Sequence, residues 1–190
     1  NFTHPLIKLV ERYITSSVGV DKPYSYLLSV LRWIDENLVY STRVPPRYPF
    51  EVIIEGAGDC DDQSNLLITL LRAKGIPSFL EIGFVYIGEN YRPPDDTSAG
   101  GLLKITMIGG GGHGWVVAYI PPWGWIRIDP VVGSGYGVPL EQYAIILALY
   151  YTFPTVVYER RFGEDYVSES AREVDVIQRN KIQYHIVLEM

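Results

Sequence analysis

Three residues of the sequence, Cys60, His113 and Asp129, have the types and surroundings that nucleophilic catalysis requires. A thiolate attacks carbonyl carbons readily, an imidazole can carry the proton between the thiol and a leaving group, and a carboxylate can orient the imidazole. Together these groups predict acyl transfer, in which part of the substrate is held briefly as a thioester. Bringing them together requires a helix for the thiol and strands for the other two groups.

Cys60 is the only cysteine of the chain and lies where a helix should begin, in GDCDDQSNLLITLLRAKGIP (58–77). Asp59 has the position of an N-cap and Asp62 follows three residues later, which is the spacing of a capping box. The free amides of a first helical turn stabilise a thiolate, whereas the carboxylates of Asp59, Asp61 and Asp62 oppose it. A cationic partner is therefore expected. A small buried side chain without chemistry is the alternative interpretation.

His113 and Asp129 both belong to the segment GGGGHGWVVAYIPPWGWIRIDPVVG (109–133). Its pattern predicts that His113 opens one strand, that PPWG forms a turn, and that Asp129 closes the next strand. A hairpin of this kind brings both residues to the same end of a sheet, where the carboxylate can fix the imidazole tautomer. Each residue also has an ordinary interpretation, His113 as a hydrogen-bonded histidine and Asp129 as a turn former before Pro130.

The rest of the chain supplies helices first and strands later. Amphipathic spacing predicts helices over residues 5–17 and 23–40, joined to the cysteine segment by an extended, proline-rich stretch at 41–53. A third helix begins at the cysteine and ends near Gly75 and Pro77. Further elements are expected as strands at 78–87, 102–108, 115–120, 125–130 and 181–189, a helix at 139–151, and polar loops at 88–101 and 131–138.

This order of elements is typical of an α+β fold, with the helices packed on one antiparallel sheet. The length of 190 residues suits one domain, which we expect to span residues 1–190.

The segment 58–85 resembles the cysteine motif of the transglutaminase-like superfamily, in which Gly-x-Cys opens a helix that ends in an Arg-Ala-x-Gly-Ile-Pro-like turn. The segment HGWVVAYIPPWGWIRIDP is similar to the second and third motifs of that family, a histidine before an aromatic strand and a strand that ends in Asp-Pro. The helix ending at Leu38, Val39 and Tyr40 also resembles the stretch before the cysteine motif. The resemblance covers a core of about residues 23–133 and leaves the C-terminal extension, 134–190, unassigned.

The resemblance implies a papain-like core in which Cys60 is the nucleophile, His113 the general base and Asp129 the orienting acid. A second oxyanion donor is needed beside the backbone amide of Cys60, and Tyr40 is the candidate. The implied partner is a protein or peptide substrate.

The composition limits other partners. The formal net charge is −6 and no run of Lys or Arg occurs, which excludes the electrostatic surface that nucleic acid requires. The longest apolar stretch, around 144–153, is too short to span a bilayer, and membrane contact is not indicated. The chain starts at Asn1, so a leader or anchor can be missing, and the compartment stays open.

Other kinds of site fit the sequence less well, and no metal or cofactor is expected. A zinc site made of Cys60, His113 and Asp129 would lack the close ligand pair with which such sites begin. The acidic segments DCDD and PPDD lack the glycine and glutamate of a calcium-binding loop. The segment GGGGH is not followed by the helix and lysine of a phosphate cradle.

Three activities remain, and amide hydrolysis is preferred to cross-linking of glutamine to lysine, or to a catalytically silent module that binds protein or peptide. Cross-linking needs a dry tunnel, whereas the glycine-rich and polar segments at 109–114 and 92–101 predict open, hydrated loops. Trp115, Trp123 and Trp125 would weaken this preference if they lined the cleft, although aromatic residues alternating along strands are more often core.

Overall fold

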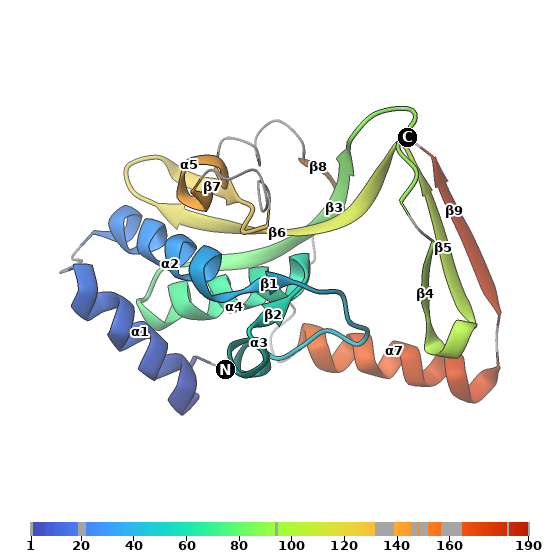
Figure 1. Ribbon diagram of the computed structural model, residues 1–190, viewed down its shortest axis with the longest axis horizontal. Helices are drawn as coiled ribbons and strands as arrows, with labels where there is room; N and C mark the ends of the chain where they lie inside the picture. The colour runs from blue at the N-terminus through green and yellow to red at the C-terminus, as the bar shows by residue number, and fades with distance from the viewer. Residues whose placement is uncertain are drawn as a thin grey trace.

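The computed structural model describes residues 2–18, 22–93, 95–131, 139–145, 148, 152–156, 165–181 and 183–189. The molecule has a core of helices packed against a four-stranded sheet, and beside it a second layer that we call the arm (Figure 1). The arm consists of the described residues of 96–108, 166–181 and 183–189. This arrangement confirms the predicted α+β class.

Four helices form the helical side of the core: α1 (Pro5–Val18), α2 (Pro23–Asn37), α3 (Pro49–Glu55) and α4 (Cys60–Ala73). Helix α4 is central, because it contacts the other three helices and also the sheet. None of the described helices combines the length and hydrophobicity that a bilayer crossing needs. The fully buried apolar side chains on these helices include Leu27, Val30, Leu31, Val52, Leu66, Leu67, Leu70 and Leu71.

The core sheet has the strand order β7-β6-β3-β8, and its neighbouring strands run antiparallel. Its members are β3 (Ser78–Tyr86), β6 (Gly110–Ile120), β7 (Gly124–Ile128) and β8 (Thr152–Val156). The turn predicted at PPWG connects β6 to β7. Strand β6 pairs with both β3 and β7. It is long and extends from the hydrophobic core toward the arm (Figure 1).

The arm sheet has the order β4-β5-β9, formed by β4 (Asp96–Ser98), β5 (Leu103–Ile108) and β9 (Tyr184–Glu189). Helix α7 (Tyr166–Asn180) runs from the core along the lower side of the molecule to this sheet (Figure 1). The short 3₁₀ helix η1 (Ala99–Gly101) contacts α7. The arm therefore adjoins the core at two places, the start of α7, where Tyr166 hydrogen-bonds Asp61, and the end of β5, which Gly109 connects to β6.

The prediction of one antiparallel sheet is wrong for β5, which lies in the arm and pairs in parallel with β9. Gly109, with φ of 87°, turns the chain between β5 and β6, so the two strands diverge instead of pairing. The glycine run that follows is also not a loop, because residues 110–112 belong to β6 and pair with β3. A Cβ at Gly110 would lie 2.0 Å from the carbonyl oxygen of Val85, so only glycine allows this close approach.

Two other expectations about local structure are corrected. The second helix ends at Asn37, and Val39–Tyr40 instead forms a short strand, β1, parallel to β2 (Ala57–Gly58). The stretch expected to be extended at 41–53 contains the start of α3, because Pro49 suits a first helical turn and the Glu51 carboxylate accepts a hydrogen bond from the backbone N–H of Tyr48, the N-cap residue.

The remaining differences lie outside the helical core. The predicted loop 88–101 includes β4 and η1, and the sequence patterns do not predict α7. The final strand is confirmed as β9. Of the helix expected at 139–151, the structure shows α5 (Leu140–Tyr143), and the rest lies largely outside the described residues. The loop predicted at 131–138 lies outside them except for Val131.

Candidate active site

Cys60 is the first residue of α4, and the predicted capping box is present there. The side chain of Asp59 accepts a hydrogen bond from the backbone N–H of Asp62, and the side chain of Asp62 accepts one from the N–H of Asp59. Gly58 precedes the cap in the β1–β2 pair, and a Cβ at Gly58 would lie only 2.9 Å from that of Asp62. This packing fixes the turn and leaves the thiol half-buried at the helix start.

The structure brings His113 and Asp129 together. His113 is the fourth residue of β6, Asp129 directly follows β7, and the imidazole Nε2 lies 2.6 Å from Oδ2 of Asp129. The carboxylate is 1% exposed, and its other oxygen accepts a hydrogen bond from the backbone N–H of Val131. The side chain of Cys60 lies close enough to the imidazole to contribute to the pKa of His113. With Nε2 engaged by the carboxylate, Nδ1 is the ring nitrogen left for the thiol.

The surroundings of His113 favour its charged form. Burial lowers the pKa of the imidazole, but the charge and hydrogen bond of Asp129, followed by those of Cys60, outweigh it and raise the pKa to about 10. An imidazolium beside the sulfur supplies the cationic partner expected for this thiol.

The acidic residues beside Cys60 oppose a thiolate less than the sequence suggests. Asp62 is fully buried, and its carboxylate receives a 2.6 Å hydrogen bond from the Arg47 side chain and another from the Arg47 backbone. Burial, and then hydrogen bonding to and repulsion from Asp61, raise the pKa of Asp59 to about 9. The raised pKa of Asp59 favours its neutral form, and the charge of Asp62 is compensated by Arg47.

Asp61 is held by a residue from the arm. The hydroxyl of Tyr166, at the start of α7, donates a 2.6 Å hydrogen bond to Oδ2 of Asp61. Burial, and then the charge of Asp61, raise the pKa of Tyr166, so the phenol stays protonated. Sequence reasoning missed both Arg47 and Tyr166. The only available signal for Arg47 was its place in a proline-rich segment, and Tyr166 lies more than one hundred residues from its partner.

The three carboxylates of Asp59, Asp61 and Asp62 form the described group whose oxygen atoms lie close enough to share a cation, within 4.8 Å of one another. These oxygens already accept hydrogen bonds from Arg47, from Tyr166 and from backbone amides. The geometry favours helix capping over cation binding.

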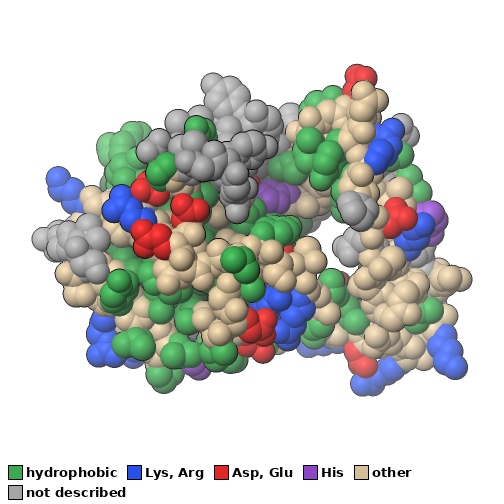
Figure 2. Space-filling view, in the orientation of Figure 1, with side chains coloured by type: hydrophobic (Ala, Val, Ile, Leu, Met, Phe, Trp, Pro, Cys, Tyr) green, Lys and Arg blue, Asp and Glu red, His purple; other side chains and the backbone are tan. Residues whose placement is uncertain are grey.

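A cleft of about 450 Å³ lies between the core and the arm, and Cys60 and His113 line it. Figure 2 shows the corresponding opening between the two parts of the molecule. The core contributes the stretch after β1 and the start of α4, while the arm contributes β5 and one face of α7. The residues lining it include Tyr40, Arg43, Leu103, Ile105, Met107, Ser170, Glu173, Val174 and Ile177.

Tyr40 lies at the end of β1 and lines the cleft beside Cys60. Burial of the phenol, and then the charges of Cys60 and Asp59, raise the pKa of Tyr40. The whole residue is 53% exposed, and its hydroxyl is close enough to the acidic groups around Cys60 to be affected by their charges. A protonated hydroxyl in this position can donate a hydrogen bond to a substrate oxygen.

Comparison with known proteins identifies the family to which this chain belongs. A profile of the transglutaminase-like superfamily matches residues 12–130. The chain belongs to the transglutaminase-like superfamily. The uncharacterized protein YebA of Bacillus subtilis (strain 168) is 32% identical over 76 residues, which are 40% of this chain and 10% of YebA.

Two solved structures are similar to parts of this chain. The periplasmic domain of TgpA from Pseudomonas aeruginosa is 21% identical, with a TM-score of 0.48, over 74% of this chain and 48% of that one. Red sea bream transglutaminase is 13% identical, with a TM-score of 0.40, over 65% of this chain and 28% of that one. The chain thus spans about a tenth of the curated relative and less than half of each solved chain.

The superfamily match covers only part of the arm. Strands β4 and β5 fall within the matched residues, but α7 and β9 lie beyond residue 130. One wall of the cleft therefore comes from a part of the chain that the superfamily profile does not cover.

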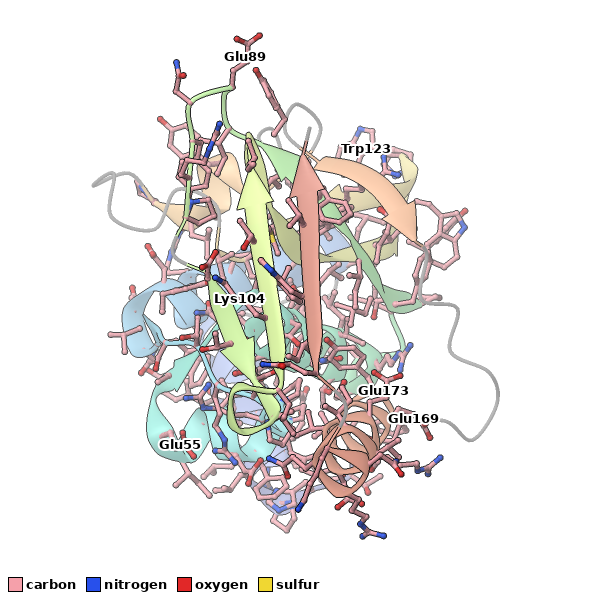
Figure 3. The ribbon with its side chains drawn as sticks, turned by 90° about the vertical axis from the view of Figure 1, so that its right-hand side faces the viewer. Glu55, Glu89, Lys104, Trp123, Glu169 and Glu173 are labelled. Carbon is pink, nitrogen blue, oxygen red and sulfur yellow. The ribbon has the colours of Figure 1, made fainter. Side chains whose placement is uncertain are left out.

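The three tryptophans considered above, Trp115, Trp123 and Trp125, do not line the cleft of this superfamily member. Trp115 is fully buried; its indole N–H donates to the carboxylate of Glu81, and its ring centroid lies 6.0 Å from that of His113. Trp123 and Trp125 are 59% and 55% exposed on and beside the β6–β7 turn. Figure 3 shows Trp123 far from α7. None of the described residues lining the cleft is a tryptophan.

Proposed function

We propose that the chain is a thiol-dependent acyl-transfer enzyme that hydrolyses amide bonds in peptides. The observation that carries this proposal is the position of His113, which bonds Asp129 through Nε2 and contacts Cys60 within one cleft. A nucleophile, a proton carrier and an orienting carboxylate are thereby arranged in a single chain of contacts.

In the first half of the reaction, the Cys60 thiolate attacks the amide carbonyl carbon and the carbonyl oxygen becomes an oxyanion. The backbone N–H of Cys60 and the hydroxyl of Tyr40 stabilise this oxyanion by donating hydrogen bonds. The His113 imidazolium then gives its proton to the amide nitrogen as the C–N bond breaks. An amine leaves, and the thioester on Cys60 remains.

In the second half, neutral His113 takes a proton from water while the water oxygen attacks the thioester carbon. Collapse of the second tetrahedral intermediate breaks the C–S bond, releases a carboxylic acid and restores the thiolate and the imidazolium. Asp129 holds the imidazole through Nε2 in both halves and stabilises its charge.

Hydrolysis is preferred to cross-linking because water reaches the thioester easily. Cross-linking requires an amine to compete with water, which calls for a dry, aromatic approach to the sulfur. The described walls of this cleft contain no tryptophan, and Figure 2 shows the space opening to the outside. The preference for hydrolysis does not depend on an open glycine-rich loop before His113, because residues 110–112 are part of β6.

The proposal is tested by labelling the protein with a thiol-directed peptide electrophile and mapping the modified residue, with Cys60→Ala as the control. In parallel, the protein is incubated with a glutamine-containing protein and a labelled primary amine while peptide cleavage and ammonia release are followed. We expect labelling of Cys60 and Cys60-dependent cleavage.

Two other outcomes would replace the proposal. Amine incorporation that depends on Cys60, without comparable cleavage, would assign a protein-glutamine cross-linking activity. Binding of peptides without labelling or turnover would assign a catalytically silent peptide-binding module.

A further inference from the structure

We propose that the cleft selects peptides with a lysine or arginine within about three residues of the attacked bond, and that Glu173 of α7 pairs with this cation. The inference rests on the proposed function, because it names the substrate class of the same cleft. It concerns the wall contributed by the arm, most of which the superfamily match does not cover.

One face of α7 lines the cleft. Tyr166, Ser170, Glu173, Val174 and Ile177 all contribute to the lining, and their spacing of three or four residues places them on one side of the helix. Tyr166 fixes the start of this face next to the thiol through its hydrogen bond to Asp61. The helix therefore extends away from Cys60 along the cleft, so a residue further along α7 lies further from the thiol. Glu173 lies about two helical turns from Tyr166.

Glu173 differs from the other charged groups of the cleft because no described residue pairs with it. Arg43 lies 2.9 Å from Glu55, Asp61 accepts the Tyr166 hydroxyl, and His113 bonds Asp129. Glu173 is an exposed side chain at the edge of the same space. An unpaired carboxylate in a partly enclosed site attracts a cation and repels an anion.

A second wall of the cleft, formed by β5, is apolar. Along β5, alternate residues point to opposite sides, and Leu103, Ile105 and Met107 line the cleft. The alternate residue Lys104 lies on the outer side of the arm sheet, which Figure 3 shows facing the viewer above Glu169 and Glu173 of α7. A lysine or arginine fits this combination, because its hydrocarbon stem can pack on apolar side chains while its charged end reaches a carboxylate.

The length of α7 sets the position of the selected residue. Glu173 follows Tyr166 by seven residues, which corresponds to roughly 10 Å along a helix. An extended peptide advances about 3.3 Å per residue, so this distance spans about three substrate residues. The cation should therefore be recognised near the attacked bond but not at the carbonyl itself.

The test uses internally quenched peptides in which one position at a time, within three residues of the cleaved bond, holds lysine, norleucine or glutamate. Norleucine keeps the hydrocarbon stem of lysine without its charge. For the wild-type protein we expect kcat/KM to be up to about fivefold higher for lysine than for norleucine at the selected position, and lowest for glutamate. The preference should fall as salt is added.

Three variants assign this preference to one carboxylate. Glu173→Gln should bring lysine and norleucine peptides to equal kcat/KM, and Glu173→Lys should reverse the order of lysine and glutamate peptides. The control, Glu169→Gln, removes a carboxylate one turn earlier on α7 that pairs with Arg172, and it should leave the preference unchanged. A lysine preference that persists in Glu173→Gln, or its absence in the active wild-type protein, would overturn the inference.

Binding measurements on Cys60→Ala separate this inference from the proposed function. If wild-type protein cleaves no peptide but Cys60→Ala binds the lysine peptide more tightly than the norleucine peptide, the hydrolytic function fails and the cation site stands. If the wild-type protein cleaves lysine and norleucine peptides equally well, the hydrolytic function stands and the cation site fails. Failure of every peptide to bind or be cleaved would overturn both.

Discussion

Nε2 of His113 lies 2.6 Å from Oδ2 of Asp129, a carboxylate that is almost completely buried behind it. His113 lies on β6 and Asp129 directly follows the neighbouring strand β7, and their contact fixes which ring nitrogen faces the thiol. The orientation of the imidazole is therefore set by the sheet and not by the substrate.

Asp129→Asn should reduce kcat for peptide cleavage by about four orders of magnitude while the protein stays folded. An amide keeps the size of the carboxylate but cannot stabilise the imidazolium or hold the same tautomer. Steady-state kinetics and circular dichroism of the variant check this, with Asp175→Asn, a surface residue that pairs with Arg179, as the control. Turnover within about tenfold of wild type would remove Asp129 from the catalytic groups.

The contact between His113 and Cys60 should be visible in the rate at which iodoacetamide alkylates Cys60. A free thiol ionises only near about pH 8.5, whereas a sulfur paired with an imidazolium reacts well below that. At about pH 6.5 we expect alkylation of wild type to be at least tenfold faster than that of His113→Gln. Equal rates in the two proteins, rising together only above about pH 8.5, would exclude the pairing.

His113 should also make the stability of the fold depend on pH. Its pKa in the folded protein is raised to about 10, against an ordinary value of 6.5, so the folded state binds more protons between these values. Its stabilising contribution is therefore complete below about pH 6.5 and is lost as the pH rises toward 10.

Urea unfolding of wild type and His113→Gln across this range measures the effect. The difference in their free energies of unfolding should shrink by on the order of a few kcal/mol between these limits, at about 1.4 kcal/mol per unit of pKa difference. Taking the difference cancels the loss expected from Asp59, whose raised pKa of about 9 acts in an overlapping range. A difference that stays constant with pH would show that His113 is not held as an imidazolium.

Tyr40→Phe should lower kcat by about 100-fold or more and change KM little, because the hydroxyl acts on the oxyanion and not on the bound amide. The raised pKa of Tyr40 keeps this hydroxyl protonated at the pH of the assay. The matched control is Tyr119→Phe, which removes the hydroxyl of a tyrosine that packs against Trp125 on β7. A kcat within about threefold of wild type would require another oxyanion donor.

Arg47→Met should destabilise the protein by about 3 to 5 kcal/mol, because it leaves the carboxylate of Asp62 buried without its partner. Adding Asp62→Asn should recover part of the loss, since a neutral amide can still cap α4. Arg43→Met removes the half-exposed neighbour that also pairs with Glu55, and it should cost about 1 kcal/mol or less. Chemical unfolding curves for the four proteins test this, and equal losses for Arg47→Met and Arg43→Met would contradict it.

Much of the core follows from short-range patterns. The capping residues Asp59 and Asp62 mark the start of α4, and the PPWG turn marks the β6–β7 hairpin that brings His113 near Asp129. Both depend on residues close in sequence, whose backbone preferences and hydrogen bonds act locally. The three candidate catalytic residues can therefore be recognised in the amino-acid sequence alone.

The arm could not be predicted in the same way. Strand β5 leaves the core sheet because Gly109 redirects the chain, and its partner β9 lies about eighty residues later. A strand pattern does not specify its partner, since pairing depends on contacts between distant segments. Helix α7 likewise contacts segments distant in the sequence, through the hydrogen bond from Tyr166 to Asp61 and through η1.

The sequence by itself determined that a cysteine opens a helix, that a histidine and an aspartate lie on neighbouring strands, and that these belong to an α+β core. Tertiary structure alone decided how the charges around the thiol are balanced, by Arg47 from one side and Tyr166 from the other, and which residues wall the cleft. The physical reason is how far apart in the sequence the interacting residues lie. Helix caps and turns form between neighbours in the chain, whereas compensation of buried charge and the shape of a cleft depend on groups that only folding brings together.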